Sequence, residues 1–486
     1  MRTMAIAMRR AFTLAIVLFW LVMLGLLVRR QAPPPGAAET SLAAAGAAPE
    51  RDEWFAVQRD GKRVGRAHRV TARSATGVRF TEDLLLSLVM LGVPQTVRTS
   101  LEADTDDRFT LRRVRFTLAS PAAVFSASGT SDGRRLAVSY GSDGRSSEAS
   151  IPLGEPIYLP VTLRPHVLAG DLTPGTSYTV PVFNPLTLRN EPLTVRVEGR
   201  ATLDGADAIV LGEEQQGLRA RVWLAADGGV LREEGSLGLT LVRESREAAL
   251  AGDAVLAPVD LIGSTRIPLA GRIDDPRHVI RLTLRVHGAA AGRVPLSPPR
   301  QRVRGDLLRI EREPLPEHAP LGAAGAALAE FLAPGPFIES DDAAIVETAR
   351  SIVGSGRDAT EAARALVAWV NEHLEQAPSL TVPSAREVLA ARRGDCNEHA
   401  VLLAALARAA GIPARVVAGA MYLDGAFYYH AWDELWLGAW VSADAVFRQL
   451  PADATHVKLL EGGPERHTQL AAIVGELQFT AEESQR

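Results

Sequence analysis

The spacing of apolar residues changes near residue 336, and this change limits the possible folds more than any other feature of the chain. Before it, short stretches such as residues 109–118 and 218–225 largely alternate apolar and polar side chains. Successive side chains of a strand point to opposite faces, so this spacing is typical of half-buried antiparallel strands. After residue 336, apolar residues recur every three or four positions, as along one face of a helix. The sequence therefore predicts a β-rich body followed by a region with helices.

Turn dipeptides separate the alternating stretches. Several are Asp-Gly pairs, among them Asp60-Gly61, Asp132-Gly133, Asp143-Gly144 and Asp227-Gly228. Such pairs favour two-residue hairpin turns, because both turn positions need a positive φ angle. Together with the alternating stretches they indicate an all-β region.

The length of 486 residues exceeds what one hydrophobic core usually serves, so a multidomain chain is expected. We assign residues 51–250 to an all-β domain, built as an antiparallel sandwich or a curled sheet. A second β-rich region covers residues 251–335. The helix-containing domain takes residues 336–486.

The amino terminus contains a long apolar run. Residues 11–28 lack any charged side chain, and as a helix they would be about 27 Å long, close to the thickness of a bilayer core. The run ends in Arg29 and Arg30 rather than in a small-residue cleavage site, which favours an uncleaved anchor over a signal peptide. We expect a cytoplasmic tail at 1–10, a transmembrane helix and a linker at 29–50. The body would then face the periplasm or the cell exterior from a single-pass inner-membrane anchor.

Two classes of explanation are excluded by composition. The net charge of -4 gives no basic footprint for nucleic acid, so we expect no such partner. Cys396 is the only cysteine, so no intrachain disulfide can form. A lone cysteine is either a small buried hydrophobic residue or a reactive thiol, and its surroundings must decide.

Helix starts are indicated at three places after residue 336. Asp358 with Glu361, and Ser384 with Glu387, have the spacing of a capping box. The third start has the same spacing, with Asp395 and Glu398, and a helix would run from there until Gly411, a residue that commonly ends helices in a left-handed conformation.

Cys396 would lie on the first turn of this third helix. There the helix dipole and the unpaired backbone N–H groups stabilise a thiolate, which lowers the pKa of the thiol. The same N–H groups could donate to a developing oxyanion. Downstream, two strands joined by a turn at Asp424-Gly425 carry His430, and the following strand leads to Asp444. Period-two alternation puts Tyr428 and Trp432 on the strand face of His430, either as cleft walls or as core aromatics.

These segments resemble the transglutaminase-like superfamily of papain-type cysteine domains, in its bacterial membrane-anchored form. The matching features are a Gly-Asp-Cys helix start, a Gly-Ile-Pro-Ala-Arg helix exit, a His-x-Trp-x-Glu strand and an aspartate on the next strand, all within residues 341–453. The resemblance implies an α+β papain-like core. It also implies that Cys396 is the nucleophile, His430 the general base and acid, and Asp444 the residue that orients the imidazole.

One position departs from the family pattern. The family aspartate is commonly followed by proline, whereas Ala445 follows Asp444 here. Asp453 is therefore an alternative third member, although Asp444 directly follows the predicted strand and is preferred. A further alternative is a metal site, in which Cys396 and His399 would be joined by His430 and Asp444. We favour a triad without metal or cofactor, since the resemblance accounts for the same residues.

The implied activity is attack of a thiolate on a carboxamide or peptide carbonyl to give a thioester. The sequence thus predicts an exported, membrane-anchored acyltransferase or hydrolase whose partner is a protein or peptide substrate. Two alternatives remain open. One is a peptidase or amidase directed at cell-wall peptides, and the other is a non-catalytic envelope binding or scaffold protein.

Overall fold

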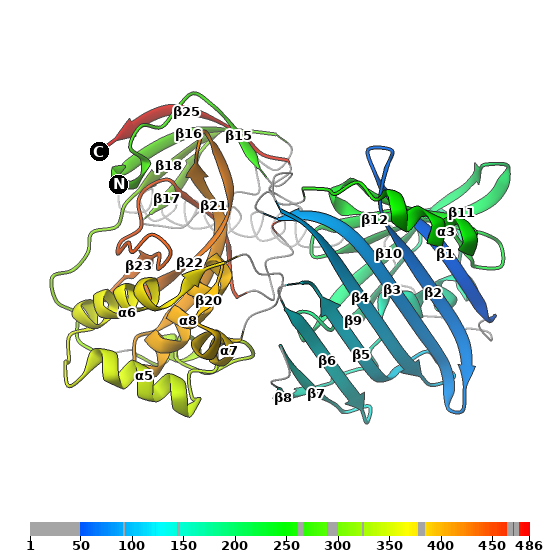
Figure 1. Ribbon diagram of the computed structural model, residues 1–486, viewed down its shortest axis with the longest axis horizontal. Coiled ribbons are helices and arrows are strands. Elements are labelled where there is room, and N and C mark those ends of the chain that lie inside the picture. Colours follow the sequence, from blue (N-terminus) through cyan, green and yellow to red (C-terminus); the bar gives the residue numbers. More distant parts are fainter. Residues whose placement is uncertain are drawn as a thin grey trace, which may run out of the picture.

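The computed structural model describes residues 49–90, 93–121, 123–142, 146–260, 266–288, 300–322, 325–377, 384–463, 470 and 476–486. The described chain forms two bodies, which lie beside each other in Figure 1. One body is a sheet of 14 strands, and the other combines a sheet of 9 strands with a group of helices. Two short segments, β19 (Glu375–Gln376) and β20 (Arg393–Gly394), pair separately.

The large sheet is antiparallel and runs in the order β8-β7-β6-β5-β4-β3-β2-β1-β14-β13-β12-β11-β10-β9. Nearly every strand therefore pairs with its sequence neighbour, and the pair β1–β14 joins the two halves. The strands are β1 (Arg51–Arg59), β2 (Lys62–Ser74), β3 (Gly77–Met90), β4 (Val93–Thr105), β5 (Leu111–Ala119), β6 (Val124–Ser131), β7 (Arg135–Ser142), β8 (Ser147–Pro152), β9 (Ser177–Asn184), β10 (Arg189–Leu203), β11 (Ala206–Gln215), β12 (Leu218–Leu224), β13 (Val230–Glu234) and β14 (Leu239–Glu244).

Local turn chemistry explains much of this order. Asp60 and Gly61 join β1 to β2 with φ angles of 49° and 73°, as a two-residue hairpin turn requires. The predicted turn at residues 227–228 likewise lies between β12 and β13. The one predicted at residues 143–144 lies outside the described residues.

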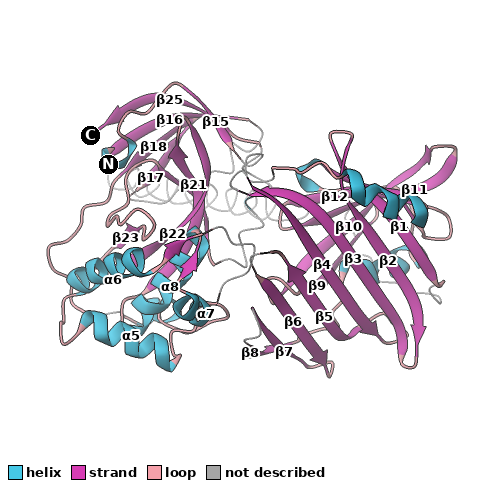
Figure 2. Cartoon of the chain, viewed as in Figure 1, coloured by secondary structure: helices cyan, strands magenta, loops and turns pink. Residues whose placement is uncertain are grey.

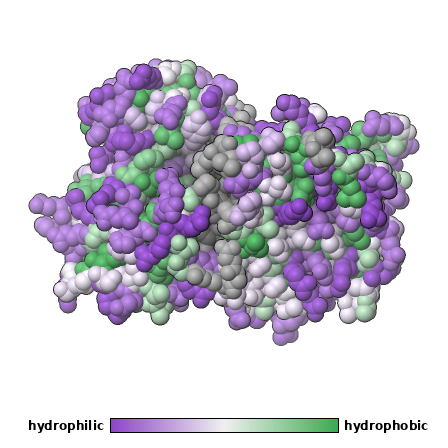
Figure 3. All heavy atoms as spheres, viewed as in Figure 1, coloured by the Kyte–Doolittle hydropathy of each residue, from purple (hydrophilic) through white to green (hydrophobic). Residues whose placement is uncertain are grey.

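The apolar face of the large sheet is covered by helix α2 (Pro160–Ala169). Leu163 and Val167 of this helix are buried in the same cluster as strand residues such as Phe55 and Tyr178. The surface shown in Figure 3 is mostly hydrophilic, with apolar side chains in small separate areas. The apolar positions of the alternating strands thus line an internal core, as their spacing predicts.

The second sheet has the order β17-β18-β16-β25-β15-β22-β21-β24, with β23 paired to β22. Its strands are β15 (Ile267–Ala270), β16 (Arg281–His287), β17 (Gln301–Arg304), β18 (Leu307–Glu311), β21 (Ala414–Leu423), β22 (Ala426–Trp436), β23 (Trp440–Ala443), β24 (His456–Glu461) and β25 (Gln478–Gln485). Strands from before residue 336 therefore lie in one sheet with strands from after it.

Helices gather beside β21 and β22 in this body (Figure 2). They are α5 (Ala343–Val353), α6 (Ala359–His373), α7 (Ala385–Ala391) and α8 (Cys396–Ala409), while the short α3 (Arg246–Ala251) lies in the other body. Helix α8 is the central one, because its residues from Ala400 to Ala407 are all buried between the sheet and the other helices.

Two of the three predicted helix caps are confirmed. Asp358 caps α6 by accepting hydrogen bonds from the N–H groups of Thr360 and Glu361. Ser384 precedes α7 as expected, but its side chain does not cap the helix. Its hydroxyl donates instead to Glu339, because that carboxylate is brought close by the tertiary fold.

The fold class expected from the sequence is wrong as a whole. We expected a transmembrane helix, a separate sandwich or curled sheet, and an α+β core. The chain is instead mostly β and is dominated by one large antiparallel sheet, and earlier strands complete the sheet of the carboxy-terminal core. No helix among the described residues is long and apolar enough to cross a membrane, and residues 11–28 lie outside that part of the chain. Alternation indicates that a segment is a strand, but distant contacts decide which strands pair.

Candidate active site

Helix α8 begins directly at Cys396, and the residues before it explain why. The Asp395 side chain accepts a hydrogen bond from the N–H of Asn397 at 2.8 Å, and Glu398 accepts from the N–H of Asp395 at 2.9 Å. This is the capping box that the sequence predicted. A Cβ added to Gly394 would lie 2.2 Å from the Cβ of Glu398, so only glycine fits there. The half-buried thiol is thereby fixed on the first turn of the helix.

His430 lies on β22, next to the residue that contacts the thiol. The backbone N–H of Ala431 donates a hydrogen bond to the Cys396 sulfur. His430 is buried, and its Nε2 lies 2.8 Å from Oδ2 of Asp444. The structure therefore places His430 beside Asp444, and the residue that follows His430 against the thiol. The bond to Asp444 uses Nε2 of His430, so Nδ1 is the other ring nitrogen.

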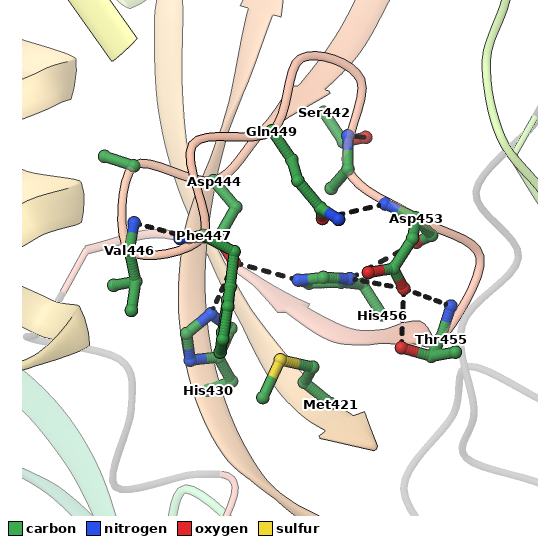
Figure 4. Close-up of polar contacts among 12 residues, drawn as sticks. Met421, His430, Ser442, Asp444, Val446, Phe447, Gln449, Asp453, Thr455 and His456 are labelled. Atoms are coloured by element: carbon green, nitrogen blue, oxygen red, sulfur yellow. Dashed lines mark hydrogen bonds and ion pairs between the residues drawn. The ribbon is translucent and has the colours of Figure 1, made fainter. Parts of the chain in front are cut away.

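Asp444 directly follows β23 and is held from several sides. Its Oδ1 accepts hydrogen bonds from the N–H groups of Val446 and Phe447, at 2.7 and 3.3 Å. Its backbone exchanges two hydrogen bonds with Gln449, of 2.9 and 2.8 Å. The carboxylate is thus fully buried and oriented with Oδ2 toward His430 (Figure 4).

His456 was missed by sequence reasoning. It opens β24, is fully buried, and its Nε2 lies 2.9 Å from the same Oδ2 of Asp444. Asp444 therefore lies between two imidazoles. The strand β24 pairs with β21, so the contact depends on sheet order rather than on sequence proximity. The one available signal was that His456 begins a segment in which it and Lys458 lie two positions apart, as on one face of a strand.

Asp453, the alternative third member, has a different position. Its Oδ1 accepts from the N–H and hydroxyl of Thr455 and lies 3.3 Å from Nδ1 of His456, while Oδ2 binds Arg277 at 2.9 Å. The carboxylate next to His430 is that of Asp444. Asp453 supports the site from behind, through His456.

Burial and charge act in opposite directions on the pKa of Asp444 and in the same direction on the pKa of Cys396. Burial alone would raise the pKa of Asp444, but the adjacent His430 and His456 lower it well below its usual range. Burial, followed by the charge of Asp395, raises the pKa of the Cys396 thiol well above its ordinary value. This is opposite to the shift expected from the helix dipole. Burial and the charge of Asp395 both favour the protonated thiol over the thiolate.

The aromatic neighbours of His430 are mainly core residues. Trp432 is 1% exposed and stacks near His430 with ring centroids 6.1 Å apart. Tyr428 is half-buried. On the opposite strand face, the Tyr429 hydroxyl donates to Oδ1 of Asn397 at 2.6 Å, which ties β22 to the start of α8.

Metal coordination was the competing interpretation of these residues. His399 is not brought to His430 as a ligand, since its Nδ1 contacts the backbone oxygen of Asp395 at 2.7 Å. Within the part of the chain that the structure describes, the donor atoms that lie within 4.8 Å of one another belong to His430, Asp444 and His456. Their N···O distances of 2.8 and 2.9 Å are hydrogen-bond lengths. Tetrahedral zinc ligands would lie about 3.3 Å apart. We therefore assign these atoms to a hydrogen-bonded network.

The family comparison agrees with this site. Residues 346–445 match the model of the transglutaminase-like superfamily, and this range includes Cys396, His430 and Asp444. The chain therefore contains a transglutaminase-like domain, as its motifs predicted. That domain is of the cysteine peptidase or acyltransferase kind. No curated protein sequence matches the chain.

Several solved structures resemble parts of the chain. A protein from Cytophaga hutchinsonii described as a "putative cysteine protease" is 19% identical, with 42% of this chain and 86% of that chain covered and a TM-score of 0.28. A "putative protease" from Parabacteroides distasonis is 13% identical, with 66% and 64% covered and a TM-score of 0.20. A beta-barrel-like protein of a domain of unknown function from Brucella abortus is 9% identical, with 41% and 98% covered and a TM-score of 0.33.

Proposed function

We propose that the protein is a cysteine acyltransferase or hydrolase that acts on amides of proteins or peptides through a thioester on Cys396. The supporting observation is that the thiol on the first turn of α8 contacts Ala431, while the preceding residue, His430, is hydrogen-bonded to Asp444. A nucleophile, a base and a group that orients the base are the parts that covalent acyl transfer requires.

The first half of the reaction forms the thioester. His430 takes the thiol proton at Nδ1 while the sulfur attacks the amide carbonyl carbon. Asp444 stabilises the resulting imidazolium through its bond to Nε2. The backbone N–H of Cys396, at the first position of α8, would donate to the carbonyl oxygen as it becomes negative. The C–N bond then breaks, and His430 returns the proton to the departing nitrogen.

The second half transfers the acyl group. Water or an amine gives up a proton to His430 and attacks the thioester carbon. The C–S bond then breaks, and His430 returns the proton to the departing Cys396 sulfur. Water as the acceptor gives a hydrolase, and an amine gives a transferase. Ammonia leaves in the first half when the substrate is a carboxamide side chain, whereas a peptide fragment leaves when it is a main-chain amide.

The test uses a peptide that contains glutamine, with hydroxylamine as an amine acceptor. We expect ammonia release, a hydroxamate product and a mass increase on Cys396 that matches an acyl-enzyme. Cys396→Ser should lower ammonia release by at least about 1000-fold, because a hydroxyl is a much weaker nucleophile than a thiolate. Unchanged ammonia release by Cys396→Ser would contradict the proposal. Release of a peptide fragment with the same acyl-enzyme would identify the activity as that of a peptidase.

A further inference from the structure

His456 is surrounded by hydrogen-bond acceptors on both ring nitrogens. Its Nε2 lies 2.9 Å from Oδ2 of Asp444, and its Nδ1 lies 3.2 Å from the carbonyl oxygen and 3.3 Å from Oδ1 of Asp453. A neutral imidazole carries one N–H, so it would point a lone pair at one of these oxygens. The geometry therefore requires an N–H on each nitrogen, which makes His456 a buried imidazolium.

Charges alternate along this part of the site. Arg277 binds Asp453 at 2.9 Å. Asp453 faces His456, and His456 faces Asp444 (Figure 4). Burial alone would lower the pKa of His456, but the two carboxylates outweigh burial and raise it. The cation on His456 therefore agrees with both the bond geometry and the adjacent charges.

A buried arginine just before β17 holds the segment that runs from Asp453 to the start of β24 at His456. Arg300 is 2% exposed and donates to the carbonyl oxygens of Ala452, Asp453 and His456. Its charge is balanced by Glu313, whose Oε2 lies 2.7 Å away. Arg300 thus fixes the backbone of this segment without removing the charge of either carboxylate next to His456.

The other charged groups near His456 have partners of their own. Lys458 follows on the same face of β24, and its Nζ lies 2.7 Å from Glu434 and 2.6 Å from Glu461. The ring of His430 lies across Asp444, with its centroid 5.6 Å from that of His456. Asp444 and Asp453 are therefore the groups that determine the charge on His456.

We propose that His456 is a positioning residue of the candidate triad, which holds Asp444 toward His430 and offsets part of the charge that Asp444 presents there. This inference rests on the proposed function. The hydrogen bond restricts rotation of the buried carboxylate. The positive charge makes a second cation on His430 less favourable, so it weakens the tendency of His430 to take the proton from Cys396.

Alkylation of the full chain by iodoacetamide tests this, because Cys396 is the only thiol. His456→Gln keeps one N–H for Asp444 but removes the cation. His430 should then hold its proton more tightly, so the acid-side midpoint of the rate profile should move up by about one pH unit. Above the midpoint the rate should rise up to about tenfold, because the thiol gives its proton to His430 more readily. A merely structural role would lower the rate and leave the midpoint in place.

Asp453→Asn provides an independent variant. It removes the anion that keeps His456 charged, so it should move the midpoint in the same direction. The double variant should move it no further than either single change, since both act through one charge. His287→Gln is the matched control, because His287 is an exposed histidine of the same body that contacts Thr480; its profile should equal that of the wild type. Midpoints of His456→Gln and Asp453→Asn that stay unchanged or move down would overturn the proposal.

Two further measurements complete the test. His456→Ala also removes the hydrogen bond, so its rate should lie below that of His456→Gln at every pH, and equal rates would refute the positioning role. Nitrogen NMR of the wild type at pH 8 should show a doubly protonated histidine that is missing in His456→Gln, and its absence would also refute the proposal. If His430→Ala keeps the wild-type profile, the proposed function itself fails. If His430→Ala changes the profile but the His456 and Asp453 variants keep the wild-type profile, only this inference fails.

Discussion

At the residue scale, the protonation of Cys396 determines how the proposed chemistry begins. The dipole of α8 favours a thiolate, but burial and the adjacent Asp395 disfavour it, and the pKa of the Cys396 thiol is raised. A thiolate present at rest would need no base. A protonated thiol needs His430 during the attack, so the bond between His430 and Asp444 bears directly on the rate.

The assignment of Asp444 rather than Asp453 to the triad is testable. Asp444→Asn keeps the size of the side chain but removes the charge that stabilises the His430 imidazolium, so we expect ammonia release to fall by about 100-fold to 10,000-fold. Asp453→Asn is the matched control, since Asp453 reaches His430 only through His456, and its rate should change by less than about tenfold. A larger loss in Asp453→Asn than in Asp444→Asn would reverse the assignment.

Sequence order was sufficient to single out the candidate triad, but it did not reveal the residues that contact Asp444 and Asp453. Cys396 starts a helix and His430 and Asp444 belong to the next strands, so local patterns and family motifs pointed to all three. His456 approaches Asp444 where β24 pairs with β21, and Arg277 reaches Asp453 from 176 residues away in the chain. No local pattern records such contacts, because they depend on strand pairing.

At the element scale, the start of α8 is the part most sensitive to backbone packing. Gly394→Ala would place a Cβ 2.2 Å from the Cβ of Glu398. Glu398 is the residue that closes the capping box with Asp395. We expect a loss of about 1 to 3 kcal/mol in the free energy of unfolding and a lower rate of Cys396 alkylation. Chemical denaturation and iodoacetamide labelling would measure the two effects.

The control for this change is Gly335→Ala. A Cβ at Gly335 meets no atom within 4 Å, so both quantities should remain near their wild-type values. Equal effects of the two substitutions would show that close packing at Gly394 is not what fixes the start of the helix.

Helix α7 shows where local patterns stop being sufficient. Its start was predicted from Ser384 and Glu387, yet neither side chain caps the helix. Ser384 donates to Glu339, and Glu387 accepts the N–H of Ser142 at 2.7 Å. Both partners come from distant segments, and one belongs to the other body. The spacing of a capping box is therefore compatible with tertiary contacts that use the same two side chains.

At the scale of the whole molecule, the two bodies meet at the helix that precedes the cysteine. Besides the bond from Ser142 to Glu387, Arg386 donates to the hydroxyl of Ser147, and the rings of Tyr140 and Phe337 contact edge to face at 5.5 Å. Helix α7 leads through β20 to Asp395 and the start of α8. The large sheet is thus in contact with the element that orders the approach to the candidate site.

Replacement of Glu387 tests how much this contact stabilises the molecule. Glu387→Ala leaves the buried N–H of Ser142 without its acceptor, so the melting temperature should fall by several degrees. Glu387→Gln keeps an acceptor without a charge. Glu347→Ala, which removes an exposed acid of α5 paired with Arg350, is the control and should have almost no effect.

The effect of Glu387→Gln should also depend on pH. Burial raises the pKa of Glu387, so its stabilising contribution is complete below the unfolded value of about 4.3 and is lost as the pH rises through the folded value. The melting temperature of the wild type, relative to that of Glu387→Gln, should therefore be higher at pH 5 than at pH 8, where the buried carboxylate is more often charged. Scanning calorimetry at the two pH values measures this difference. A difference between the melting temperatures that is the same at both values would mean that Glu387 does not titrate in the contact.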